Sequence, residues 1–326
     1  MDLASIFAPV RPDLDALDRL LGDELSADDP FVGELVAYIL KTRGKLIRPA
    51  LVCLSALACG GGTSARLEVA GAVELIHVAS LIHDDVIDAA DLRRGFASVN
   101  AIWGNQVAVL LGDYLFSKAF HMLARLHDES VAASVSEATV KMSQAEIKQI
   151  KYGNTPHTDE TIYFDIIEGK TASLFSAACR CGALTARASE PVAAALAAFG
   201  LEWGMAFQIT DDALDLTASP EHLGKPIGSD IQTGKVTLPI IHALSRASKA
   251  DRQRLEEILD GADGDRPAPA REEVEGILTR CDAIEHALAA ARARARRAAG
   301  LLDRLGESPA RESLGALVEF VTARSR

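Results

Sequence analysis

Apolar side chains recur every three to four residues along almost the whole chain. This spacing places them on one face of an α-helix, whereas the alternation expected of a half-buried strand is missing. The pattern predicts helices over 12–25, 32–41, 46–59, 66–90, 101–127, 129–152, 159–186, 191–217, 234–246, 250–260, 269–299 and 311–323. The sequence therefore predicts an all-α protein.

Short glycine-rich stretches separate some of these helices without dividing the chain. The triplet 60–62 lacks the Lys-Ser/Thr pair of a phosphate-binding loop, so we read it as a turn between helices. The stretch 261–269 is rich in Gly, Asp and Pro and indicates a surface loop, after which helical periodicity resumes with unchanged composition. Asn100 can cap a helix that begins at Ala101. We therefore predict one domain over 1–326.

Composition agrees with a helical globular protein. Of the 326 residues, 48% are apolar and 5% are aromatic, and the abundance of Ala and Leu favours helix over sheet. The formal net charge is −12. A chain this acidic has no overall electrostatic attraction for nucleic acid, so we expect no nucleic-acid partner.

Three further features predict a cytoplasmic enzyme. No apolar run reaches the ~20 residues that a transmembrane helix needs. The first residues, Met1-Asp2-Leu3, do not resemble a signal peptide. The five cysteines are odd in number, and no Cys/His set has the spacing of a zinc site.

One acidic motif occurs twice, far apart in the chain. The first copy runs Asp84-Asp85-Val86-Ile87-Asp88, and the second runs Asp211-Asp212-Ala213-Leu214-Asp215. On a helix the first and last Asp of each copy lie one turn apart on the same face, and the middle Asp can lean toward the same pocket. Each copy is embedded in apolar sequence, which a solvated acidic surface would not require.

Six carboxylates around one cavity would need positive charge nearby. Two close carboxylates repel each other by roughly 4 kcal/mol at an intermediate dielectric constant. Carboxylate oxygens suit Mg²⁺, which completes its coordination with water and with substrate phosphates. One such motif could be solvated surface, but two in similar apolar helices predict a Mg²⁺ site made of Asp84, Asp85, Asp88, Asp211, Asp212 and Asp215.

Basic residues follow or precede the acidic motifs. They are the pair Lys45 and Arg48, the adjacent pair Arg93 and Arg94, and the two lysines Lys225 and Lys235 in a glycine-rich stretch. Singly, each pair could be surface charge. Together they predict phosphate binding, because Arg and Lys are the side chains that pair with phosphate oxygens.

Polar residues on the predicted helices complete the candidate site. Lys170 and Thr171 lie in the middle of a helix, and Gln208 lies three residues before Asp211 on the same face. A hydroxyl and an amide carbonyl can direct lone pairs at a developing cation. His77 lies two turns before Asp84, although a lone helical His is more often a packed or surface residue.

At this point the sequence resembles the trans-isoprenyl diphosphate synthases of the polyprenyl synthetase family. The resemblance runs from about Gly44 to Pro239. It rests on Gly44-Lys45…Arg48-Pro49, Glu74-Leu75-Ile76-His77, His83-Asp84-Asp85-Val86-Ile87-Asp88, Arg93-Arg94-Gly95, Gly112-Asp113, Lys170-Thr171, Phe207-Gln208, Asp211-Asp212…Asp215, Gly224-Lys225, Gly228…Asp230 and Gly234-Lys235. Two positions depart from the family pattern, since Arg43 precedes Gly44-Lys45 and Phe96 follows Gly95.

The resemblance implies an all-α bundle of about a dozen helices around a deep central cavity, usually as a homodimer. It implies Mg²⁺-dependent head-to-tail condensation of an allylic diphosphate with isopentenyl diphosphate. The two Asp triplets would hold Mg²⁺ on the allylic diphosphate, with contacts from Arg93, Lys170, Lys225 and Lys235. Lys45, Arg48, His77 and Arg94 would bind isopentenyl diphosphate, and Thr171 and Gln208 would support the carbocation.

The resemblance also bears on product length. Ala79 and Ser80 lie one turn before Asp84 and would line the tunnel for the growing chain, at a level where short-chain synthases often carry an aromatic floor. We therefore expect a heptaprenyl to decaprenyl product, with octaprenyl as the single best estimate, and farnesyl or geranylgeranyl diphosphate as primer. The alternative is that Ala79 only permits close helix packing and that a floor elsewhere ends growth.

Two other functions are compatible with parts of this pattern. A class I terpene cyclase also uses an Asp-rich helix, but its second metal motif typically contains Asn, Ser or Thr and Glu. It would also leave Lys45, Arg48 and His77 unexplained. A non-catalytic partner subunit of a heteromeric synthase would be expected to have lost Asp or Lys residues, whereas all six Asp are present here.

Overall fold

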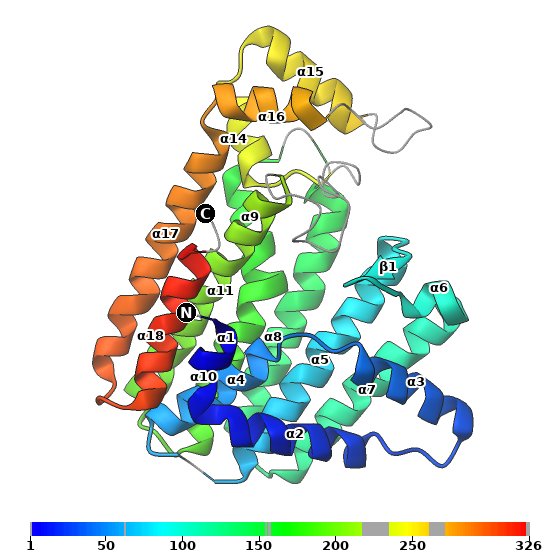
Figure 1. The fold of residues 1–326 in the computed structure, drawn as a ribbon, viewed down its shortest axis with the longest axis vertical. Coiled ribbons are helices and arrows are strands. Elements are labelled where there is room, and N and C mark those ends of the chain that lie inside the picture. Colours follow the sequence, from blue (N-terminus) through cyan, green and yellow to red (C-terminus); the bar gives the residue numbers. More distant parts are fainter. Residues whose placement is uncertain are drawn as a thin grey trace. The chain divides into compact units, whose positions relative to one another are not determined.

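A computed structural model describes residues 2–61, 63–153, 155, 158–216, 235–260 and 271–323. Their Cα positions cluster into two compact units. Unit 1 comprises Met1–Thr139, Leu174–Gly200 and Ala299–Leu317, and unit 2 comprises Val140–Ser173, Leu201–Ala298 and Val318–Arg326. The all-α prediction is confirmed, since almost every described element is a helix (Figure 1). The assignment of one domain to the whole chain stays a prediction.

Unit 1 is organised around one long buried helix. Its elements are α1 (Leu3–Ile6), the 3₁₀ turn η1 (Ala8–Val10), α2 (Arg11–Glu24), α3 (Pro30–Lys41), α4 (Ile47–Ala58), α5 (Ala65–Ile87), β1 (Leu92–Arg93), β2 (Phe96–Ala97), α6 (Val99–Trp103), α7 (Asn105–Arg125), the start of α8 (Glu129–Lys148), most of α10 (Ser173–Thr185), the first part of α11 (Glu190–Asp215), η4 (Leu302–Arg304) and the start of α18 (Pro309–Ala323). Helix α5 packs against α2, α4 and α7 (Figure 1). It is apolar almost all round and nearly every residue from Val69 to Ala79 is buried, which is why it can occupy the core.

The first departure from the predicted helices lies directly after the first Asp triplet. Helix α5 ends at Ile87, and Ala89 adopts a left-handed φ of 49°. The chain then forms a two-stranded antiparallel hairpin in which Arg93 pairs with Phe96. Its turn residues, Arg94 and Gly95, both have positive φ (53° and 79°), as a two-residue type I′ turn requires. Strands of two residues carry no period, so the sequence pattern could not reveal them.

Two predicted helices are each divided by one residue with positive φ. Gly104 (φ 84°) separates α6 from α7 within predicted 101–127. Asp282 (φ 52°) separates α16 (Arg271–Arg280) from α17 (Ala283–Leu301) within predicted 269–299. The predicted cap Asn100 was wrong, because the Ser98 side chain caps α6 and accepts from the Ala101 N–H at 3.3 Å.

Unit 2 contains two π-helical turns within otherwise α-helical stretches. Its elements are the end of α8, the π-helix η2 (Gln149–Gly153), α9 (Glu160–Ile167), the π-helix η3 (Glu168–Ala172), the rest of α11, α14 (Leu238–Arg246), α15 (Lys249–Asp260), α16, most of α17 and the end of α18. Single π-turns are rare and often lie at functional sites, because they rotate the side chains that follow. Lys170 and Thr171 both lie in η3.

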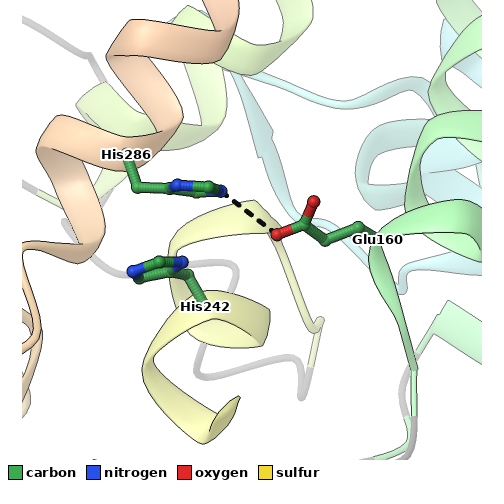
Figure 2. A group of neighbouring side chains, drawn as sticks. All are labelled: Glu160, His242 and His286. Atoms are coloured by element: carbon green, nitrogen blue, oxygen red, sulfur yellow. Dashed lines mark hydrogen bonds and ion pairs between the residues drawn. The ribbon is translucent and has the colours of Figure 1, made fainter. Parts of the chain in front are cut away.

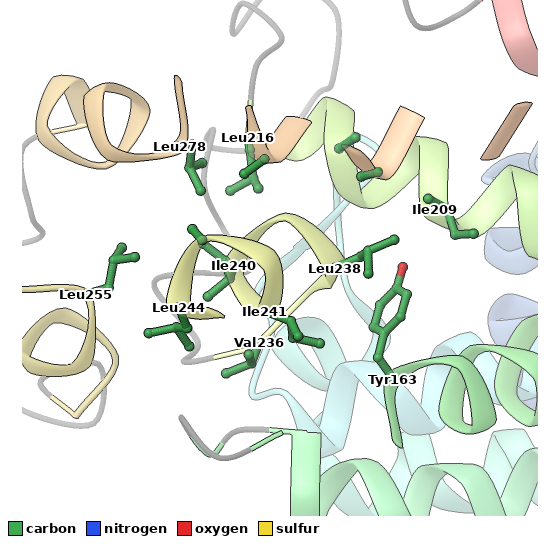
Figure 3. Close-up of a cluster of buried hydrophobic side chains, with 14 of the residues drawn as sticks. Tyr163, Ile209, Leu216, Val236, Leu238, Ile240, Ile241, Leu244, Leu255 and Leu278 are labelled. Carbon is green, nitrogen blue, oxygen red and sulfur yellow. The ribbon is translucent and has the colours of Figure 1, made fainter. Parts of the chain in front are cut away.

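The core of unit 2 forms around α14. Leu238, Ile240 and Leu244 of this helix lie among buried side chains from neighbouring elements, including Tyr163 of α9 and Leu278 of α16 (Figure 3). Helix α14 contacts α9, α15 and α16. Lys235 and Val236 lie shortly before α14, and the Val236 N–H donates to the Gly153 carbonyl at 2.9 Å.

Two of the described helices, α7 and α11, are long and apolar enough to cross a membrane by length and composition alone. The core helices of globular proteins pass the same test, and more than half of the α11 window is buried inside the protein. These helices are weak evidence for a membrane segment.

Candidate functional site

The first Asp triplet lies at the carboxyl end of α5. Asp84 and Asp88 are one turn apart and reach the surface, whereas Asp85 is only 4% exposed. Nε and Nη2 of Arg93 each lie 2.6 Å from Oδ1 of Asp85. The middle carboxylate is therefore held by a cation of the protein itself, and the first and last carboxylates remain at the end of the helix.

The hairpin that carries Arg93 is tied to its surroundings by three hydrogen bonds. The Tyr38 hydroxyl donates to the Ala97 carbonyl at 2.6 Å. The Ser98 hydroxyl and the Asn100 amide donate to the Ala90 carbonyl at 2.6 and 3.1 Å. These bonds fix the loop after α5, so the Arg93 side chain has a defined position against Asp85.

A buried acid lies among the cations of the predicted isopentenyl diphosphate site. Glu74 is 3% exposed, and burial raises the pKa of its carboxyl although Arg48, Arg94 and Arg43 act in the opposite direction. Burial also lowers the pKa of Arg94, and Glu74 opposes that shift. Glu74 therefore lies among these arginines, whose charges oppose the effect of burial on its pKa.

The other members of this cation group are defined by packing. The Arg48 guanidinium lies over the Phe175 ring, 4.2 Å from its centroid. Residue Arg94 is exposed at the hairpin turn, but its guanidinium lies against Gly44, where an added Cβ would come within 2.5 Å of Nη1. Lys45, the next residue, is exposed. Gly44 therefore provides the space that the Arg94 guanidinium occupies.

His77 is half-buried next to the same arginines. Its pKa lies well below the usual range, first because the ring is desolvated and second because Arg48, Arg94 and Arg93 are positively charged. The imidazole is therefore neutral near pH 7 and can donate or accept a hydrogen bond.

One pocket in unit 1 is lined both by Arg93, which pairs with Asp85, and by Arg43 and Arg94, which lie near Glu74. Its lining comprises Tyr38, Ile39, Thr42, Arg43, Val78, Leu81, Ile82, Asp85, Arg93, Arg94, Phe96, Ala97, Ser98 and Val99. The site residues Asp85, Arg93 and Arg94 share this pocket, and Arg43, which the sequence pattern treated as a departure, also lines it.

The two predicted chain-length residues lie one turn before Asp84 on α5. Ala79 is completely buried. Ser80 is half-buried, and its hydroxyl donates to the His77 carbonyl of its own helix at 2.8 Å. Both side chains are small, and the tunnel that they are expected to line stays a prediction.

His83, beside the triplet, has a packing role. Its ring stacks on Phe116 of α7 and lies 3.1 Å from the Val109 carbonyl. A Cβ on Gly112 would come within 2.2 Å of His83 Nε2. Gly112 therefore lets α7 approach α5 closely.

The second Asp triplet lies at the carboxyl end of α11, in unit 2. Its middle carboxylate, Asp212, is 2% exposed. The Tyr163 hydroxyl donates to Oδ2 at 2.6 Å, Gln208 Nε2 donates to Oδ1 at 2.8 Å, and Lys235 Nζ lies 3.6 Å from Oδ1. Asp211 and Asp215 are half-buried. As in the first triplet, protein groups hold the middle Asp.

A chain of hydrogen bonds connects Asp212 to Thr171. A carboxylate only accepts hydrogen bonds, so the Gln208 NH₂ group must face Asp212. Gln208 Oε1 then faces the Thr171 hydroxyl, which donates to it at 2.9 Å. Lys170, the neighbour of Thr171 in η3, forms an ion pair with Glu146 of α8.

These groups line a second pocket, wholly within unit 2. Its lining comprises Gln149, Gly153, Thr158, Tyr163, Ile166, Ile167, Lys170, Thr171, Gln208, Lys235 and Val236. The structure thus brings Lys170, Thr171, Gln208 and Lys235 together as predicted. Lys225 lies outside the described residues, and a common cavity for the two Asp triplets stays a prediction.

Sequence reasoning missed three residues of the site. Glu74 was noted only as part of a motif, Tyr163 was read as an ordinary helical residue, and Glu146 was not singled out. A charged residue in an apolar helix, three residues before His77, was the available signal for Glu74. No local signal pointed to Tyr163, because its partner Asp212 is remote in sequence.

The carboxylates at the helix ends fit a hard cation. Asp84 and Asp88 offer oxygen donors one turn apart, as Asp211 and Asp215 do, and their triplets already have cationic or hydroxyl partners for the middle residues. Mg²⁺ prefers oxygen ligands and takes few of them from protein. The donor set therefore suits Mg²⁺ bridging to a phosphate-bearing substrate.

Known proteins resemble this chain over its full length. The polyprenyl synthetase family matches residues 29–275. An octaprenyl diphosphate synthase of Haemophilus influenzae is 35% identical over 100% of this chain and 98% of its own length. A short chain isoprenyl diphosphate synthase of Methanothermobacter thermautotrophicus is 41% identical over 88% of each chain. Among solved structures, a polyprenyl synthase from Caulobacter crescentus, complexed with calcium and isoprenyl diphosphate, superposes with a TM-score of 0.94 at 29% identity, covering 100% of this chain and 98% of that one.

Proposed function

The chain belongs to the polyprenyl synthetase family, and from that premise we propose that it condenses an allylic diphosphate head-to-tail with isopentenyl diphosphate into an all-trans polyprenyl diphosphate. One observation carries the proposal. In both Asp triplets a protein group holds the middle carboxylate, and the first and last lie one turn apart at a helix end.

The outer carboxylates are suited to hold Mg²⁺ on the allylic diphosphate. Bound there, Mg²⁺ would stabilise the negative charge on the departing diphosphate. Asp84 and Asp88 would provide ligands from α5, and Asp211 and Asp215 from α11. Asp85 and Asp212 would act as anchors, because Arg93 already pairs with Oδ1 of Asp85 and Tyr163 already donates to Oδ2 of Asp212.

The lysines of unit 2 are suited to exchange partners when substrate binds. Lys170 forms an ion pair with Glu146, and Lys235 Nζ lies 3.6 Å from Oδ1 of Asp212. A diphosphate carries more negative charge than one carboxylate and would draw both ammonium groups toward itself. Lys225 and Arg93 would complete the contacts to the allylic diphosphate.

The arginines around Glu74 are suited to bind the second diphosphate. Arg48 and Arg94 offer planar guanidinium groups for bidentate contacts, Lys45 is exposed at the entrance, and neutral His77 can donate a further hydrogen bond. No ionised nucleophile of the protein is required. The allylic C–O bond breaks and diphosphate leaves, and the isopentenyl double bond then forms the new C–C bond to C1 of the allylic cation. The released diphosphate would accept the proton that the isopentenyl unit loses.

Thr171 and Gln208 would support the positive charge that develops at the allylic carbon. Because the Thr171 hydroxyl donates to Gln208, its oxygen lone pairs face away from that bond. Gln208 cannot rotate without losing its hydrogen bond to Asp212. These fixed dipoles would stabilise the cation without reorganising during the reaction.

The product is proposed to be of heptaprenyl to decaprenyl length, most simply octaprenyl, with farnesyl or geranylgeranyl diphosphate as primer. Small side chains at Ala79 and Ser80 support this length, as does the full-length similarity to an octaprenyl diphosphate synthase. The similarity to a short chain synthase makes product length the quantity to measure first.

The protein is proposed to act in the cytoplasm as a homodimer. Helix α7 exposes large apolar side chains, among them Val109 (41%), Leu110 (68%) and Phe120 (39%). Val109 and Phe120 lie three turns apart on the same side of the helix, and a second copy of α7 would cover them. Leu110→Glu should shift the sedimentation coefficient from dimer to monomer, and a wild-type protein that sediments as a monomer would contradict the proposal.

The decisive assay combines purified protein, labelled isopentenyl diphosphate and farnesyl diphosphate, with Mg²⁺ or with excess chelator. We expect elongation only with Mg²⁺, and mass analysis gives the product length. Asp84→Asn should lower kcat, whereas Lys45→Ala should raise KM for isopentenyl diphosphate. Cyclised products would indicate a terpene cyclase, and no elongation with any primer would indicate a non-catalytic partner subunit.

A further inference from the structure

Three metal-ligating side chains meet in unit 2 at a place that the proposed reaction does not use. Glu160 is the first residue of α9, His242 lies on α14 and His286 lies on α17 (Figure 2). Oε1 of Glu160 lies 3.1 Å from Nε2 of His286. One ligand atom from each of the three residues lies within 4.8 Å of the others. These groups come from three separate helices and converge on one point.

The two imidazole rings lie face to face. Their centroids are 3.9 Å apart and their planes differ by 18° (Figure 2). Stacked rings of this kind repel each other when both are protonated, so the arrangement favours at least one neutral imidazole. Neutral imidazole is the form that binds metal ions.

The backbone of Cys281 lies beside the His242 ring. A hydrogen bond from the second nitrogen of a metal-binding imidazole to such a backbone group would orient the first nitrogen toward the metal.

The dimensions suit a transition metal. Ligand atoms around tetrahedral Zn²⁺, about 2.0–2.1 Å from the metal, lie roughly 3.3 Å from one another. The Glu160–His286 pair is already close to this separation, and side-chain movement of at most about 1.5 Å would bring the third ligand atom to it. Two imidazoles and one carboxylate are a known Zn²⁺ ligand set, whereas Mg²⁺ prefers oxygen alone.

We propose that Glu160, His242 and His286 form a Zn²⁺ site that joins α9, α14 and α17. The side chains of Glu160 and His286 are 44% and 37% exposed, so an ion can enter from solvent and a water can fill the fourth position. This inference does not depend on the proposed condensation reaction.

The site has a structural consequence for the second Asp triplet. Tyr163 follows Glu160 by one turn on α9. Lys235 lies three residues before Leu238, the first residue of the helix α14 that carries His242. Both residues hold Asp212. A metal that fixes α9 against α14 would therefore stabilise the surroundings of Asp212.

Equilibrium dialysis against Zn²⁺ in the presence of excess Mg²⁺ tests the proposal, because Mg²⁺ occupies the carboxylate triplets. We expect one tight Zn²⁺ per chain. His286→Gln should weaken this binding by at least about 100-fold. His121→Gln, which changes an exposed histidine of α7, is the matched control and should bind as the wild type does.

Thermal unfolding provides a second readout. At Zn²⁺ concentrations about 100 times Kd, the midpoint should rise by about 5 °C in the wild type and not in His286→Gln. Glu160→Gln, which can still hydrogen-bond with His286, covers the case in which a histidine variant fails to fold. It should keep its metal-free midpoint and lose the Zn²⁺ response.

Two results would overturn the proposal. One is Zn²⁺ binding that is unchanged in Glu160→Gln, His242→Gln and His286→Gln. The other is the absence of any tight Zn²⁺ in the wild type, which would make the cluster an ion pair beside a stacked ring. Cys281→Ser should leave binding intact, and loss of Zn²⁺ in that variant would assign the metal to the thiol instead.

Discussion

At the scale of single residues, the two acidic triplets follow the same rule. The middle Asp of each points into the protein, where Arg93 holds Asp85 and Tyr163 holds Asp212. A buried carboxylate without such a partner would cost several kcal/mol. These partners therefore compensate for the burial of the two middle carboxylates.

Replacement of Tyr163 by Phe should affect both stability and turnover. The variant leaves one oxygen of buried Asp212 without its 2.6 Å donor. A hydrogen bond to a charged group contributes about 1.5–3 kcal/mol, so the free energy of unfolding should fall by about 2 kcal/mol. Because Asp212 orients Gln208, kcat should fall about tenfold while KM for isopentenyl diphosphate stays near its wild-type value.

Denaturant unfolding and steady-state kinetics measure these effects. Tyr114→Phe on α7 is the matched control, because this ring lies near Lys118 of its own helix. A Tyr163→Phe variant with wild-type kcat would remove Tyr163 from the positioning of Asp212.

His77 should make stability depend on pH in a defined window. Its pKa in the folded protein is well below the ordinary 6.5, so below pH 6.5 the unfolded chain binds a proton that the folded protein does not. Stability from this group is therefore complete above pH 6.5 and is lost as pH falls, by about 1.4 kcal/mol per pH unit. His77→Gln should remove this slope below pH 6.5.

Denaturant melts at several pH values compare the wild type, His77→Gln and His121→Gln. The His121 variant should keep the wild-type slope. Equal slopes in all three proteins would mean that His77 titrates normally in the folded state.

At the scale of elements, the helices position the triplets and the connections between them position the cations. The β1–β2 hairpin carries Arg93 and Arg94, and its turn directs the Arg94 guanidinium toward Gly44. The segment before α4, which contains Gly44, is therefore in contact with the hairpin, and we propose that the two bind phosphate together.

Gly44→Ala tests this contact between elements. The added Cβ would lie 2.5 Å from Arg94 Nη1, so the guanidinium must move. Since only the end of a flexible side chain moves, we expect little change in the unfolding midpoint but an increase of about tenfold in KM for isopentenyl diphosphate, equivalent to one lost charged contact.

The control for this variant is Gly33→Ala on α3, where an added Cβ meets nothing within 4 Å. It should keep the wild-type KM and gain up to about 1 kcal/mol of stability, because Ala is the better helix former. A Gly44→Ala enzyme with unchanged KM would show that Arg94 does not bind this substrate from its present position.

At the scale of the whole molecule, the proposed control of product length is how far an apolar chain can extend from the Asp triplets. Ala79 is completely buried one turn before Asp84. If Ala79 lines the proposed tunnel, Ala79→Phe should block it and shift products toward farnesyl or geranylgeranyl diphosphate, with the first condensation preserved. Product mass analysis measures the shift.

A second variant keeps this prediction testable if Phe at position 79 prevents folding. Ser80→Phe introduces the same ring at a half-buried neighbour. An unchanged long product from folded, active Ala79→Phe and Ser80→Phe variants would place both residues outside the tunnel, in favour of simple helix packing.

The sequence by itself determined the helices and the chemistry at their ends. Helical periodicity and the four-residue spacing within each Asp triplet are properties of neighbouring residues, so they can be recognised in the sequence without knowledge of packing. The all-α fold and the positions of most helices could be predicted in this way, whereas the grouping of Lys170, Thr171, Gln208 and Lys235 was implied by the family resemblance. The predicted helix 66–90 was too long only at its end, because α5 ends at Ile87 and Ala89 adopts a left-handed φ.

Only the tertiary structure decided which groups meet across the chain. Glu74 lies among arginines of three segments, Tyr163 reaches Asp212 from another helix, and the Glu160–His242–His286 cluster is assembled from three helices. Such contacts depend on how helix faces pack together, and packing is decided by side-chain shape and burial over the whole fold. For that reason no local pattern indicates them.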